Sequence, residues 1–79
     1  MSDPRTRTIE LMSTNIRLIL AGIPPEVQGG VLAELVSVFI AAHHPELREA
    51  MLEMHVDLVR DLIPETEKEI FPHGLPEDW

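Results

Sequence analysis

The side chains best suited to chemistry are four histidines, at His43, His44, His55 and His73. Neutral imidazole binds metals and exchanges protons near neutral pH. Their spacing matches no zinc motif of the His-x-x-x-His or His-Glu-x-x-His kind, and the chain has no cysteine. The simplest interpretation is that His43 and His44 end a helix, and that His55 lies at the edge of a core. A metal or small-ligand site at His43, His44 or His55, completed by Glu34, is the weaker alternative.

Glu34 is the only charged residue in the long apolar stretch 27–42. If the helices on either side of His44 and Pro45 form an antiparallel hairpin, residues equidistant from the turn face one another, which places His55 level with Glu34. A buried carboxylate is costly unless it is paired. The sequence therefore predicts a Glu34–His55 hydrogen bond, within or between chains, unless Glu34 points to solvent. The weak metal alternative would use Glu34, His44 and His55.

Arg48 interrupts an arc of helix that is otherwise apolar. A guanidinium there is expected to reach water along its aliphatic stem or to meet a carboxylate across an interface. A ligand-binding role is the weaker alternative. The neighbouring acids form a row that is most simply a solvated face, or else a docking surface for a basic partner: Glu46, Glu49, Glu53 and Asp57.

Catalysis has little support in the sequence. The chain has no glycine-rich phosphate loop, no cysteine nucleophile, and no serine or threonine in a recognised nucleophile motif. We therefore expect a protein that is not an enzyme and that carries no cofactor.

The chain is strongly acidic, with a formal net charge of −8. Nucleic-acid binding depends on lysine and arginine, so this charge argues against it. The charge is uneven, because residues 1–22 sum to +1 whereas residues 45–79 sum to −7. The two ends can therefore attract each other, within a chain or between chains. A small acidic inhibitor that mimics the charge of nucleic acid is a further alternative.

Hydrophobic periodicity and punctuation predict an all-α fold in one helical domain, 1–71. Three helices are expected, at about 5–21, 25–43 and 45–63. Pro64 is expected to stop the third helix, leaving room for a short helix over 65–71. The Pro-rich tail 72–79 is expected to be flexible.

Two residues mark the ends of the first helix. Asp3 precedes Pro4, which suits an N-cap followed by proline at the first helical position. Gly22 fits the position after the helix, where a left-handed conformation closes the last turn.

The helices over 25–43 and 45–63 are apolar around more of their circumference than one neighbour can cover. We therefore expect a homodimeric helical bundle in which these two helices of each chain form a four-helix core. Its expected interface residues are Leu35, Phe39, Leu52, Val56, Val59 and Arg48.

The sequence predicts a small, cytoplasmic, non-enzymatic module for protein–protein interaction or regulation. The polar N-terminus lacks the apolar segment of a secretory signal, and the central stretch is shorter than the ~20 apolar residues that span a bilayer. The expected partners are a second copy of the chain and a protein with a basic surface.

Overall fold

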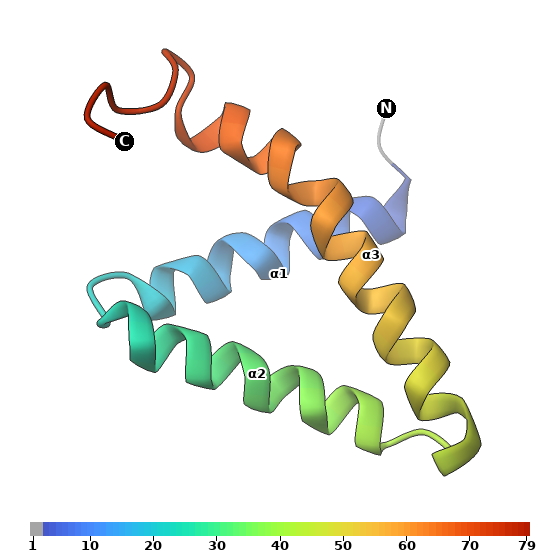
Figure 1. Ribbon diagram of the computed structural model, residues 1–79. Helices are drawn as coiled ribbons and strands as arrows, with labels where there is room; N and C mark the ends of the chain where they lie inside the picture. Colours follow the sequence, from blue (N-terminus) through green and yellow to red (C-terminus); the bar gives the residue numbers. More distant parts are fainter. Residues whose placement is uncertain (1–2) are drawn as a thin grey trace. The chain divides into compact units, whose positions relative to one another are not determined.

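The computed structural model describes residues 3–79. This part of the chain forms three helices and no strand: α1 (Pro4–Leu20), α2 (Pro25–Ala41) and α3 (Pro45–Ile70) (Figure 1). The all-helical class and the three main helices are therefore confirmed. None of the three is long and apolar enough to cross a membrane.

Helix α1 begins and ends where its sequence indicates. The Asp3 carboxylate accepts hydrogen bonds from the backbone N–H groups of Arg5 (2.8 Å) and Thr6 (3.1 Å), so it satisfies donors that have no partner inside the helix. At the other end Gly22 has φ +80°, a conformation that costs glycine little. The predicted N-cap and the predicted left-handed glycine are both confirmed.

Helix α3 corrects the expected boundaries. It runs without a break from Pro45 to Ile70 and contains Pro64, so the predicted stop at residue 63 is wrong, and the short helix expected over 65–71 is the end of α3. A proline inside a helix removes one backbone hydrogen bond and crowds the preceding turn. The residues after Pro64 still favour helix, and the Lys68 ammonium lies 3.5 Å from the Glu65 carboxylate, one turn apart.

The tail after α3 is irregular but contains local bonds. The N–H of Gly74 donates to the carbonyl of Phe71 (3.0 Å), and the N–H of Trp79 donates to that of Pro76 (3.2 Å). The rings of Phe71 and Trp79 meet edge to face, with centroids 5.3 Å apart. The tail thus folds back on Phe71, the residue that follows α3.

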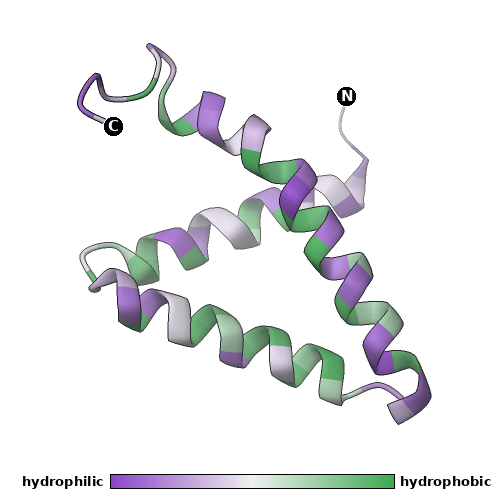
Figure 2. Cartoon of the chain, viewed as in Figure 1, coloured by the Kyte–Doolittle hydropathy of each residue, from purple (hydrophilic) through white to green (hydrophobic). Residues whose placement is uncertain are grey.

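The chain divides into two compact units, 1–36 and 37–79, with the boundary inside α2. The first unit contains α1 and the first part of α2, and the second contains the end of α2, α3 and the tail. Figure 2 shows apolar residues along most of α2 and a mixed pattern on α3. None of the described side chains in either unit is buried, so neither unit has a core of its own.

Candidate functional site

The turn between α2 and α3, where the chain passes through His43 and His44, holds several hydrogen bonds between side chains and the backbone. The Nδ1 atom of His43 lies 2.8 Å from the carbonyl oxygen of Phe39. A carbonyl can only accept, so this nitrogen carries the proton and donates. The His43 and Phe39 rings also meet edge to face at 5.1 Å.

His44 has the opposite hydrogen-bonding role. It is the N-cap of α3, and its Nδ1 atom accepts the backbone N–H of Glu46 at 3.2 Å. This nitrogen must therefore be unprotonated. The sequence predicted that His43 and His44 end the helix over 25–43, but α2 ends at Ala41, so both residues lie in the turn that follows it. The role of His44 as the N-cap of α3 was not predicted.

Arg48 caps the preceding helix from the first turn of α3. Its Nε donates to the carbonyl of His43 (3.0 Å), and its Nη2 donates to the carbonyl of Ala41 (2.9 Å). Carbonyls at a helix C-terminus have no partner within the helix, and a cation there also suits the helix dipole. Arg48 is also exposed, so its contact with water or with a carboxylate across an interface stays a prediction, and the two bonds to carbonyls are an addition to it. The available signal was a basic residue just beyond a turn that ends a helix.

His55 is half-buried, and its ring lies 6.1 Å from that of Phe39, tilted by 46°. The Phe39 ring therefore contacts two imidazoles, those of His43 and His55. Glu34 belongs to the other compact unit, so the Glu34–His55 hydrogen bond stays a prediction.

These histidines do not form a metal centre with their neighbours. Across residues 3–79, no group of three or more His, Cys, Asp or Glu side chains is placed to hold a metal ion. The Nδ1 atoms of His43 and His44 both make local backbone bonds, which leaves only the Nε2 atom of each ring as a metal ligand. Glu34 belongs to the first unit and His44 and His55 to the second, so the alternative of Glu34, His44 and His55 as ligands stays a prediction.

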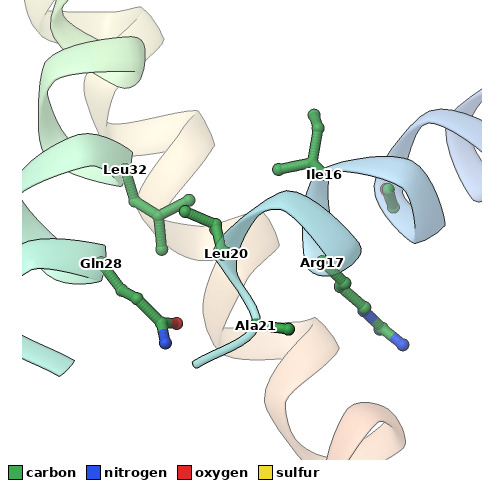
Figure 3. A pocket seen from close by; sticks show the side chains of 7 residues that line it. Ile16, Arg17, Leu20, Ala21, Gln28 and Leu32 are labelled. Carbon is green, nitrogen blue, oxygen red and sulfur yellow. The ribbon is translucent and has the colours of Figure 1, made fainter. Parts of the chain in front are cut away.

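The first unit contains an open hollow of about 490 Å³ between α1 and the start of α2. Figure 3 shows Leu20 and Leu32 leaning toward each other, while the Arg17 side chain extends away from them. Gln28 lines the same hollow, but its amide nitrogen already donates to the carbonyl of Ile23 at 2.7 Å. The hollow is shallow and mainly apolar, and it presents no convergent set of polar groups.

The predicted interface residues lie on exposed helix faces. Phe39 is 48% exposed and Leu52 is 40% exposed. The rest of the set is similarly exposed: Leu35, Val56, Val59 and Arg48. Apolar groups of this size gain about 1.5–3 kcal/mol each when fully buried, so these faces are available to a partner.

Acidic side chains border one of these faces. A shallow hollow of about 330 Å³ runs along α3 beside Leu52 and Val56, and its other lining residues are Glu49, Glu53, Asp57 and Arg60. Within it, the Arg60 guanidinium lies 3.7 Å from the Asp57 carboxylate. Both side chains are well exposed, so this pair contributes little to stability.

No protein-family model, curated protein or solved structure matches the chain.

Proposed function

We propose that the chain is a small, acidic, non-enzymatic interaction module that self-associates through α2 and α3. The observation that carries this proposal is that apolar side chains make up 44% of the sequence, yet none of those described is buried. Contiguous exposed apolar surface on a soluble protein marks an interaction site.

Two neighbouring stripes on α3 explain why one partner helix does not suffice. The Val56 stripe consists of residues four or three apart, Leu52, Val56, Val59 and Ile63. The Met54 stripe lies beside it and consists of Met51, Met54, Leu58 and Leu62. All of these side chains are exposed except Met51, which is half-buried.

A twofold dimer is the commonest small assembly, and it places the same patch of both copies in one interface. In the proposed dimer the Val56 stripe packs with Leu35 and Phe39 of α2 into a four-helix core. Interfaces of obligate dimers are as apolar as a domain core cut in half. The Val56 stripe of α3, with Leu35 and Phe39 of α2, is apolar in the same way.

Sedimentation equilibrium tests the proposal directly. We expect twice the chain mass of 8.9 kDa at micromolar concentration, and a melting temperature that rises with protein concentration. Leu52→Glu should shift the equilibrium toward monomer. Leu18→Glu is the matched control, since Leu18 is an exposed leucine on α1, outside both stripes. A folded monomer at all concentrations would overturn the proposal.

A further inference from the structure

Helix α1 carries an exposed apolar stripe of its own, and a cation, Arg5, lies at one end of it. The Ile9 stripe consists of Ile9, Met12, Ile16 and Ile19, which recur on one face of the helix and are exposed. Arg5 lies one turn before Ile9 on the same face. Helix α1 as a whole contains three arginines and one glutamate, a net charge of +2.

The Met54 stripe of α3 ends in acids. Asp61 borders the stripe next to Leu62, and Glu65 follows Leu62 by three residues on the same face. Helix α3 contains eight acids and three bases, a net charge of −5. Its bases are engaged locally: Arg48 with carbonyls, Arg60 with Asp57, and Lys68 with Glu65. The helix as a whole therefore stays acidic, although Glu65 already pairs with Lys68.

The two stripes match in length when the helices run antiparallel. Arg5 and Ile19 are fourteen positions apart, as are Met51 and Glu65. This is about 21 Å of helix in each case. In this register Arg5 meets Asp61 and Glu65 at one end, and the apolar residues of both stripes lie opposite each other between the ends.

We propose that the Ile9 stripe of α1 docks antiparallel on the Met54 stripe of α3 in a second copy of the chain, with Arg5 facing Asp61 and Glu65. This inference rests on the proposed self-association, and it gives α1 a role in it. The core proposed above brings together two α3 helices, each with a net charge of −5, and the cationic α1 helices offset that repulsion.

A pair of charge reversals on one helix tests the docking. Arg5→Glu reverses the charge at the end of the Ile9 stripe, whereas Arg7→Glu makes the same change in net charge on the opposite side of α1. Both positions lie near the start of α1, where an acid suits the helix dipole, so both variants should remain helical by circular dichroism. We expect Arg5→Glu to weaken dimerisation about tenfold at low salt, and Arg7→Glu to have a much smaller effect.

Salt and complementary variants complete the experiment. The loss of dimer affinity in Arg5→Glu should be smaller at 1 M salt, where screening shortens the range of electrostatic interactions to about 3 Å. Mixing this chain with one that carries Asp61→Lys and Glu65→Lys should restore a dimer containing both chains. Equal effects of Arg5→Glu and Arg7→Glu, or no recovery on mixing, would overturn the docking while leaving self-association intact. A wild-type chain that is monomeric at every concentration would overturn both.

Discussion

Arg48 donates a hydrogen bond of 2.9 Å to the carbonyl of Ala41, seven residues back along the chain. The bond links the first turn of α3 to the last residue of α2. A second bond of the same guanidinium, to the carbonyl of His43, lies in the loop between them. One side chain therefore holds the helix end and the turn together.

Replacing Arg48 with alanine should destabilise the protein. The carbonyls of Ala41 and His43 each lose a charged hydrogen-bond donor. Because Arg48 is exposed, water can donate to these carbonyls instead, so the free energy of unfolding should fall by only about 1 kcal/mol. Urea denaturation measures it. Arg60→Ala is the matched control, because it removes only an exposed ion pair, which should cost about 0.3 kcal/mol. Equal losses in the two variants would contradict a capping role for Arg48.

Acid should weaken the start of α1 through Asp3. Hydrogen bonds from the backbone N–H groups of Thr6 and then Arg5 hold the pKa of the Asp3 carboxyl below its ordinary value. A carboxyl whose pKa is lower in the folded state stabilises that state above its unfolded pKa of about 3.9. This contribution is lost as pH falls through the lower, folded value.

NMR titration of Asp3 measures this shift. Asp3→Asn keeps an acceptor for the cap but has no carboxyl to titrate, so the start of α1 should no longer respond to acid through this residue. Asp3→Ala removes the cap and should fray the first turn at every pH. An Asp3 that titrates at the unfolded value would show that the cap does not form in solution.

Replacing Pro64 with alanine should strengthen α3. Alanine restores the N–H that can donate to the carbonyl of Arg60, and it removes the clash of the proline ring with the preceding turn. The gain should be up to about 3 kcal/mol, reduced by the greater freedom of alanine in the unfolded chain. Circular dichroism and urea denaturation measure it, with Glu67→Ala as the control for an exposed site in the same helix. A decrease in helicity would contradict the expected cost of Pro64 inside the helix.

Removing the Trp79 side chain should have a small effect on stability. The ring meets Phe71 edge to face but is 77% exposed, so Trp79→Ala should cost at most about 1 kcal/mol. Ending the chain after Phe71 should change the melting temperature by only a few degrees. A large loss in either variant would show that the tail covers apolar surface.

Local sequence signals predicted the start of each helix and the end of α1 well, because each depends on a few neighbouring residues. Asp3, Gly22 and Pro45 act through their own backbone and the next turn. The predicted end of α3 at Pro64 was wrong, since a proline inside a helix weakens one turn, and the helix-forming residues after Pro64 can outweigh that cost. The sequence likewise identified Arg48 as an unusual charge but did not predict its partners. These are backbone carbonyls, and their direction depends on the path of the turn.

The expected dimer interface, unlike a helix end, does not depend on neighbouring residues in the sequence. Whether Leu35 or Val56 is covered depends on a second surface, and no periodicity within one chain identifies it. What periodicity does predict is the width of the apolar face, and the exposed stripes on α1 and α3 agree with that prediction.

The bonded turn between α2 and α3 has a consequence for the order of folding. Its bonds join residues at most seven apart, and loops of this size close in about 10–100 ns. Such a turn needs no second chain in order to form. If stability comes from association, the turn is complete before two chains meet, and the bimolecular encounter limits the rate. Refolding of the whole protein should then accelerate in proportion to its concentration, whereas the turn itself forms at a rate independent of it.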